Sequence, residues 1–174
     1  MLQSYLSIIK DILVPNDITD AVINIDIDFL LEKNFKTLVF DIDNTLVPRS
    51  EKLISLNVLS WLEKAKAHGL DIYFLSNNSS KSRIEKICKQ AEVKGFYFAC
   101  KPLAYSLKDL AYRYQFDLSK TVMIGDQMLT DVVVGNWVGA FTILVDPLDK
   151  KLSFFKTFQR DLELRLLKKL TKTA

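Results

Sequence analysis

The sequence predicts an α/β protein built as a three-layer, doubly wound parallel sheet. Short apolar segments alternate with longer segments whose apolar residues recur at helical spacing. This alternation is typical of parallel βαβ units. In addition, polar residues follow the short segments at their carboxyl ends, where open parallel sheets place their sites. Right-handed crossovers would bring all of these strand ends to one edge of the sheet.

The expected elements follow in order along the chain. Apolar residues at helical spacing predict a helix over residues 2–13, ended by Pro15. The alternation within residues 20–31 favours either an edge strand or a packed arm. Leu53 and Leu56 begin the apolar face of the next predicted helix. The predicted strands are residues 37–40, 70–75, 96–99, 121–124 and 141–145, and the predicted helices are residues 53–69, 82–90, 105–114 and 131–138.

Length and composition indicate one globular domain, residues 1–174. We expect an N-terminal arm (1–35), a catalytic core (36–146) and a basic amphipathic C-terminal segment (147–174). Hydrophobic residues make up 49% of the chain and charged residues 26%, which is ordinary for a soluble protein. Two cysteines without a paired spacing indicate a reducing compartment. Neither a transmembrane segment nor a signal peptide is predicted.

Two carboxylates stand at the end of the strand predicted over residues 37–40. Asp41 and Asp43 follow this apolar segment, with Thr45 two residues further on. Burying two acids so close together is costly unless something uses them. One carboxylate acting as nucleophile and the other as acid/base is a chemically sensible pair. The alternative is a strand that ends in a turn with solvated acids.

Polar residues also follow the other predicted strands, as Ser76-Asn77, Lys101, and Gly125-Asp126 with Asp131 beyond. Each group alone also fits a helix cap, a loop lysine or a turn. If the strands are parallel, however, all of them meet in one crevice. Carboxylates gathered there would repel one another unless a cation compensates, and Mg²⁺ suits such oxygen ligands best. The set suits phosphoryl transfer.

The motifs Asp41-Ile-Asp43-Asn-Thr45, Leu75-Ser76-Asn77, Lys101-Pro102 and Gly125-Asp126 with Asp131 resemble those of the haloacid dehalogenase (HAD) superfamily. The likeness spans residues 36–146, and within the superfamily the motifs are similar to those of the YqeG-like group of subfamily IIIA, which resembles mitochondrial phosphatidylglycerophosphatases. It implies a Rossmann-like core and a phosphatase. Trp137 stands where that group leads us to expect arginine.

The resemblance also implies a role for each matching residue. Asp41 would be the nucleophile that forms an aspartyl-phosphate, and Asp43 the general acid/base. The phosphate would be held by Thr45, Ser76, Asn77 and Lys101. The Mg²⁺ site would consist of Asp41, Asp43 (through its backbone carbonyl) and Asp126, with Asp131 orienting these ligands.

The substrate class is predicted from spacing and charge. The intervals between Asp43, Ser76 and Lys101 hold no room for a cap domain, so the open site favours a phosphate carried on something large. Residues 150–174 carry eight Lys or Arg and two acids, a net charge of +6. Because the whole chain has a net charge of +3, residues 1–149 carry −3. This segment fits either an anionic membrane surface or packing on the core.

We therefore expect a cytoplasmic enzyme, peripheral at the inner face of a membrane, that dephosphorylates phosphatidylglycerophosphate. An anionic phospholipid would be its partner, and nucleic acid is not expected. The alternatives are a soluble phosphatase for a small phosphometabolite or nucleotide, and a non-catalytic adaptor that keeps the fold.

Overall fold

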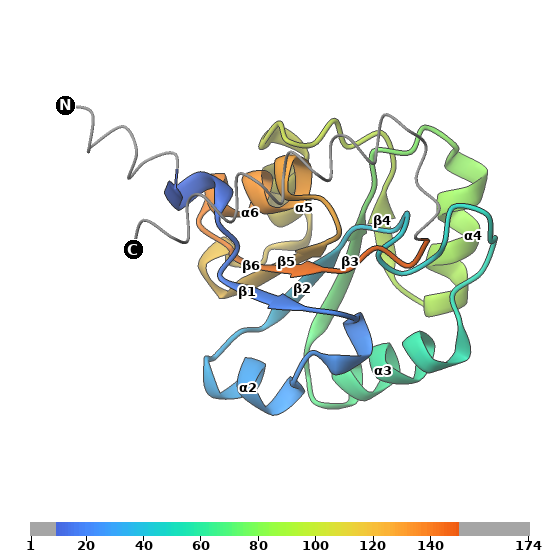
Figure 1. Ribbon diagram of the computed structural model, residues 1–174, viewed down its shortest axis with the longest axis horizontal. Coiled ribbons are helices and arrows are strands. Elements are labelled where there is room, and N and C mark those ends of the chain that lie inside the picture. Colours follow the sequence, from blue (N-terminus) through green and yellow to red (C-terminus); the bar gives the residue numbers. More distant parts are fainter. Residues whose placement is uncertain (1–9, 150–174) are drawn as a thin grey trace.

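The computed structural model describes residues 10–149. Within this range a parallel six-stranded sheet has the strand order β1-β6-β5-β2-β3-β4 (Figure 1). The chain runs outward from β2 (Thr37–Phe40) through β3 (Asp71–Leu75) to the edge, then returns to β5 (Thr121–Gly125) on the other side of β2. The strand order therefore reverses between β2 and β5. Open α/β sheets bind ligands at such a point, beyond the carboxyl ends of the strands.

Helices cover both faces of the sheet, which confirms the predicted three layers (Figure 1). Leu38 and Phe40 of β2 belong to one core and Val39 to the other, as the period-two alternation of a strand requires. The first core is closed by α2 (Ile27–Glu32), α3 (Leu56–Ala67) and α4 (Lys81–Ala91). The second is closed by α5 (Tyr105–Tyr114) and α6 (Val133–Val138).

The remaining elements complete the sheet and its connections. β1 (Asp17–Thr19) pairs with β6 (Phe141–Val145) at one edge, and β4 (Lys94–Phe96) pairs with β3 at the other. The short helical turns are η1 (Val22–Asn24), η2 (Leu118–Lys120) and η3 (Met128–Val132). The strands predicted over residues 37–40, 121–124 and 141–145 are therefore confirmed.

Three local predictions are wrong. The strand predicted over residues 96–99 ends at Phe96, because Phe98 and Cys100 take positive φ angles that a strand cannot hold. The helix predicted from Leu53 begins at Leu56, and both leucines are exposed, so the buried face starts at Val58. The residues expected as one helix over 131–138 divide between η3, a π-helical turn, and α6.

The ambiguous region near the amino end is resolved by the structure. An edge strand exists, but it is β1 at residues 17–19, and residues 20–31 form η1 and most of α2. Residues 10–13 are helical, while the rest of the helix predicted over 2–13 and the segment 150–174 lie outside the described residues. No helix in residues 10–149 is long and apolar enough to cross a bilayer.

Candidate active site

Asp41 and Asp43 follow β2 at the centre of the sheet. The backbone N–H of Asp41 donates to the carbonyl oxygen of Ile124 on β5 at 2.8 Å, so the strand pairing reaches as far as the first acid. Ile42 between the two acids is fully buried in the core, whereas both carboxylates line one pocket. Both are nevertheless buried, so each needs partners that offset its lost hydration.

A tight turn places Thr45 beside the first carboxylate. Asn44 takes a φ of 73°, a conformation that asparagine tolerates better than most residues, and its N–H donates to the Val47 carbonyl oxygen at 2.8 Å. The Thr45 hydroxyl then lies 3.4 Å from Oδ2 of Asp41 and 3.4 Å from Oδ1 of Asp126. Thr45 therefore braces the carboxylates, and it is not among the residues that line the pocket.

Lys101 lies among the acids as a buried cation. Its Nζ atom is 2.6 Å from Oδ1 of Asp41 and 2.7 Å from Oδ1 of Asp131, and it donates to the Leu75 carbonyl oxygen at 2.8 Å. Burial opposes its charge, but the carboxylates of Asp131 and Asp41 outweigh burial and raise the pKa of Lys101 above its usual value. Lys101 is therefore a fixed positive charge beside Asp41.

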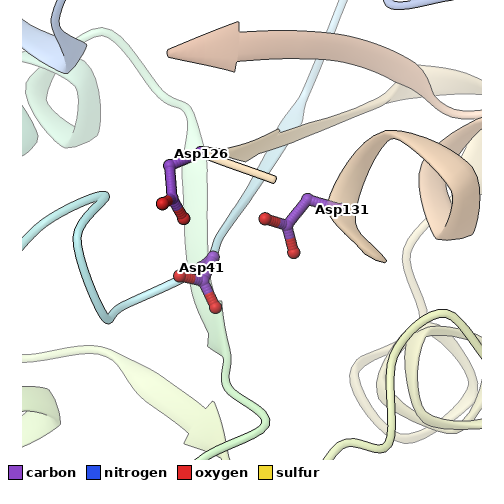
Figure 2. A group of neighbouring side chains, drawn as sticks. All are labelled: Asp41, Asp126 and Asp131. Carbon is purple, nitrogen blue, oxygen red and sulfur yellow. The ribbon is translucent and has the colours of Figure 1, made fainter. Parts of the chain in front are cut away.

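Asp41, Asp126 and Asp131 form a cluster of three buried carboxylates. One oxygen of each lies within 4.8 Å of the others, and the side chains turn toward one another from the ends of β2 and β5 and from η3 (Figure 2). Burial raises the pKa of Asp41 to about 6, although the charge of Lys101 opposes this. Burial, then the charges of Asp41 and Asp131, raises the pKa of Asp126 to about 8. A divalent cation would relieve this repulsion.

Gly125 lets Asp131 approach the cluster. A Cβ atom at position 125 would lie 2.2 Å from Oδ2 of Asp131, which is a steric clash. The same Oδ2 accepts a hydrogen bond from the Gln127 N–H at 3.1 Å. The glycine before Asp126 is thus required by packing against the acid six residues later.

The loop after β3 supplies Ser76, Asn77 and Asn78. Ser76 Oγ accepts from the Asn78 N–H at 3.1 Å. The Asn77 amide bonds to the backbone of Lys101 in both directions, at 3.0 and 2.7 Å. Ser76 and Asn77 both line the pocket, and the side chain of Asn77 is already engaged in positioning the loop that carries Lys101.

The carboxylate of Asp43 is held by two residues that sequence reasoning missed. Arg83 of α4 donates to Oδ1 of Asp43 from Nη2 at 3.0 Å and from Nε at 3.3 Å, and Asn78 donates to Oδ2 at 2.8 Å. The Asp43 carboxylate is not part of the three-acid cluster. One signal for Arg83 exists in the sequence, since a cation in the first turn of a helix opposes the helix dipole.

These residues surround a pocket of about 280 Å³. Only α3 and β3 separate Asp43 from Ser76, and only α4 and β4 separate Ser76 from Lys101, so neither interval inserts a cap domain over the pocket in the described part of the chain. Arg49, Gln127 and Thr130 also line it, which the sequence alone did not predict. The full lining is Asp41, Asp43, Arg49, Ser76, Asn77, Asn78, Lys101, Gln127 and Thr130.

Comparison with known proteins agrees with this geometry. A family model described as HAD-hydrolase-like matches residues 98–147. Over 159 residues the chain is 31% identical to the "Probable phosphatase YqeG" of Bacillus subtilis, covering 91% of this chain and 92% of that protein. The chain belongs to the HAD-like phosphatases. The resemblance inferred from the motifs is therefore confirmed.

Other relatives of this HAD-like phosphatase differ in length or in sequence. "Phosphatidylglycerophosphate phosphatase 1, chloroplastic/mitochondrial" of Arabidopsis thaliana is 31% identical over 154 residues, covering 83% of this chain but 44% of that protein. An uncharacterized protein from Listeria monocytogenes shares the fold with a TM-score of 0.55 and 19% identity, covering 79% of this chain and 99% of that one.

A solved phosphatase shares the fold as well. The cobalt-bound deoxy-D-mannose-octulosonate 8-phosphate phosphatase of Haemophilus influenzae superposes with a TM-score of 0.52 at 15% identity, covering 65% of this chain and 69% of that one. Together with the Listeria structure, it confirms the predicted fold class of this HAD-like phosphatase.

Proposed function

We propose that this phosphatase hydrolyses its phosphomonoester through an aspartyl-phosphate on Asp41. The observation that carries the proposal is the buried contact of 2.6 Å between Lys101 Nζ and Asp41 Oδ1 in the wall of the pocket. Lys101 keeps Asp41 ionised despite burial, and it is placed to attract the oxygens of a phosphate. Fixed charges of this kind are the main contribution of a protein to phosphoryl transfer.

Asp43 is the proposed general acid and base. It would donate a proton to the leaving oxygen when Asp41 attacks phosphorus, and would then take a proton from the water that cleaves the aspartyl-phosphate. Arg83 and Asn78 hold its carboxylate from two sides, which fixes its position at the pocket. Ser76 and Lys101 would bind the phosphoryl oxygens, while Thr45 and Asn77 support Asp41 and the Lys101 loop.

We assign Mg²⁺ to the carboxylates of Asp41, Asp126 and Asp131, with the backbone carbonyl of Asp43. The donor set fits the ion, since all the donors are oxygens and three buried carboxylates lie together. A bound Mg²⁺ would supply positive charge that neutralises these acids and the phosphate. The cobalt-bound form of the Haemophilus relative supports a divalent cation in this fold.

Phosphatidylglycerophosphate is the substrate that we propose. Its support is the name of the Arabidopsis relative at 31% identity and the absence of a cap over the described pocket. Arg49 adds a further reason. It is exposed, lines the pocket and forms no salt bridge within residues 10–149, although its charge acts at longer range to lower the pKa of Asp126, whereas Lys101 and Arg83 are in direct contact with carboxylates. The phosphodiester of this lipid, close to its terminal phosphate, would give Arg49 an anionic partner.

Phosphate release from several substrates would test this assignment. Phosphatidylglycerophosphate in mixed micelles would be compared with glycerol phosphate, a sugar phosphate and a nucleoside monophosphate, each with Mg²⁺ and with EDTA. A Mg²⁺-dependent preference for the lipid supports the proposal. Preference for a soluble ester would reject the lipid and keep the phosphatase chemistry.

A further inference from the structure

Large apolar side chains are exposed around the mouth of the catalytic pocket. They lie on loop 48–56, which runs from the Asp43 turn to the first residue of α3, and on loop 97–105, which runs from β4 to the first residue of α5. Because β2 and β4 are parallel members of one sheet, both loops lie at the edge that carries Asp41. We call these two loops the mouth face. Its exposed apolar and aromatic residues are Leu53, Leu56, Tyr97, Phe98, Leu103 and Tyr105.

Phe98 is unusual in both backbone and side chain. Its φ of 54° is a left-handed conformation that disfavours a bulky residue. Its side chain is 65% exposed, so core packing does not offset that backbone cost. Because packing within the fold does not account for an exposed phenylalanine in this conformation, we attribute it to contact with an apolar partner outside the fold.

Loop 97–105 is joined directly to the pocket. The Phe98 N–H donates to the Asn78 carbonyl oxygen at 3.0 Å, and the Ala99 N–H donates to the Ser76 carbonyl oxygen at 2.9 Å. Ser76 and Asn78 line the pocket. The backbone at Phe98 is therefore fixed beside the pocket, and the same loop carries Leu103, which is 63% exposed.

Loop 48–56 of the mouth face and the first turns of α4 beside it are basic. Residues 48–56 and 81–86 together carry five Lys or Arg and two acids, Glu51 and Glu85, so their net charge is +3. By contrast, the net charge of residues 1–149 as a whole is −3. Arg83 pairs with Asp43 and Lys81 with Glu85. Lys52 and Lys86 line a second hollow of about 340 Å³ beside Arg83. Apolar and basic side chains thus lie on segments that adjoin the pocket, a combination that suits anionic lipid headgroups.

We propose that the mouth face docks on an anionic lipid bilayer, with Phe98 and Leu103 among the acyl chains and Lys52 and Lys86 at the headgroups. This inference rests on the proposed lipid substrate and extends it, because it locates membrane contact in the catalytic core. Docking in this orientation would place the open pocket at the headgroup layer. The bilayer would then exclude water from a site over which residues 10–149 form no cap domain.

The test uses the full chain with Phe98→Asn and Leu103→Ser combined. Asparagine tolerates the left-handed backbone conformation at position 98, so the variant should fold like the parent. The control is Tyr112→Ser with Trp137→Ser, two exposed aromatic residues near the carboxyl ends of α5 and α6. Each protein is sedimented with vesicles of phosphatidylcholine alone or with phosphatidylglycerol, and assayed on p-nitrophenyl phosphate.

The mouth variant should bind phosphatidylglycerol vesicles roughly tenfold more weakly than the parent and the control. Its rate on p-nitrophenyl phosphate should be unchanged. Equal vesicle binding by all three proteins, or none by the parent, would overturn the docking surface. So would a change of oligomeric state with vesicle binding intact, which would make this face a contact between copies. If the parent binds vesicles through the mouth face but does not turn over the lipid, only the proposed substrate fails.

Discussion

The Lys101 ammonium lies 2.6 Å from the Asp41 carboxylate, and both side chains are buried. Asp41 comes from the end of β2, and Lys101 from the loop after β4, at the far edge of the sheet. The Asn77 amide holds the backbone of Lys101 from the intervening loop. The contact between nucleophile and cation is therefore set by three neighbouring strand ends, and it explains how a buried aspartate keeps its charge.

Lys101→Met should remove the cation and leave Asp41 and Asp131 without their shared partner. Turnover should fall roughly 100- to 1,000-fold, since a fixed charge beside the developing phosphoryl charge is lost. The free energy of unfolding should fall by about 3 kcal/mol, because breaking a buried ion pair leaves uncompensated charge. Phosphate release and urea unfolding would measure the two effects. A variant with more than half of the parental rate would contradict the assigned role.

Arg83→Gln should weaken the positioning of Asp43. A general acid matters most when the leaving group is a poor one, so the rate on glycerol phosphate should fall roughly tenfold more than the rate on p-nitrophenyl phosphate. Lys86→Gln, one turn along α4, serves as the matched control. Equal losses on both substrates would indicate that Arg83 supports the fold and does not act through Asp43.

Arg49→Gln should discriminate between substrates with and without a second phosphate. We expect KM to rise about tenfold for phosphatidylglycerophosphate and to change little for glycerol phosphate, because only the former offers a phosphodiester to the guanidinium. Lys120→Gln, an exposed lysine that precedes β5 at the opposite edge of the sheet, is the control. If KM rose equally for both esters, Arg49 would be binding the phosphate that is removed.

Gly125→Ala should displace the Asp131 carboxylate, because the new methyl group would lie 2.2 Å from Oδ2. The Mg²⁺ concentration for half-maximal activity should rise roughly tenfold, and the overpacking should cost about 1–3 kcal/mol of stability. Gly69→Ala is a useful control. Nothing lies within 4 Å of its Cβ position, so it should cost stability through its φ of 82° without changing the Mg²⁺ requirement. Unchanged metal dependence in Gly125→Ala would separate Asp131 from the metal site.

The stabilisation by Mg²⁺ should grow with pH. Burial, with Asp41 and Asp131, raises the pKa of Asp126 from 3.8 to about 8 in the metal-free fold. Between these values the folded chain holds a proton that the unfolded chain has lost, so metal-free stability falls as pH rises across this window. A bound cation would replace that proton.

Thermal unfolding in Mg²⁺ and in EDTA would therefore differ more at pH 8 than at pH 5, by on the order of 5 °C. In Asp126→Asn this pH dependence should largely disappear. An equal difference at both pH values in the parent would contradict the assignment of Asp126 to the metal.

The strands that hold the acids could be predicted because their signals are local. β2 and β5 are continuous apolar segments, and parallel topology alone was enough to place together the polar residues that follow them, Asp41 and Asp126. The end of β4 could not be predicted, because no residue type in 96–99 indicates the positive φ angles that Phe98 and Cys100 adopt. Leu53 and Leu56 match the apolar period of α3 but precede its packed turns, so periodicity alone assigned them to the core.

The residues around Asp43 were missed for a different reason. Arg83 and Asn78 reach it from the connection after β3, and Arg49 approaches from a loop without regular structure. Side-chain pairing across such distances depends on packing between elements, which motif spacing does not encode. The motifs therefore predicted the acids, the lysine and the fold, while the cations that orient and surround them emerged only from the structure.

Trapping the covalent intermediate would test the central claim most directly. The enzyme with Mg²⁺ would be quenched during turnover of p-nitrophenyl phosphate and treated with borohydride, which reduces an aspartyl-phosphate to homoserine, and the peptides would be analysed by mass spectrometry. We predict homoserine at position 41, dependent on substrate and absent from Asp41→Asn. Homoserine at another aspartate, or none under conditions that trap a known aspartyl-phosphate enzyme, would contradict the assignment of Asp41 as nucleophile.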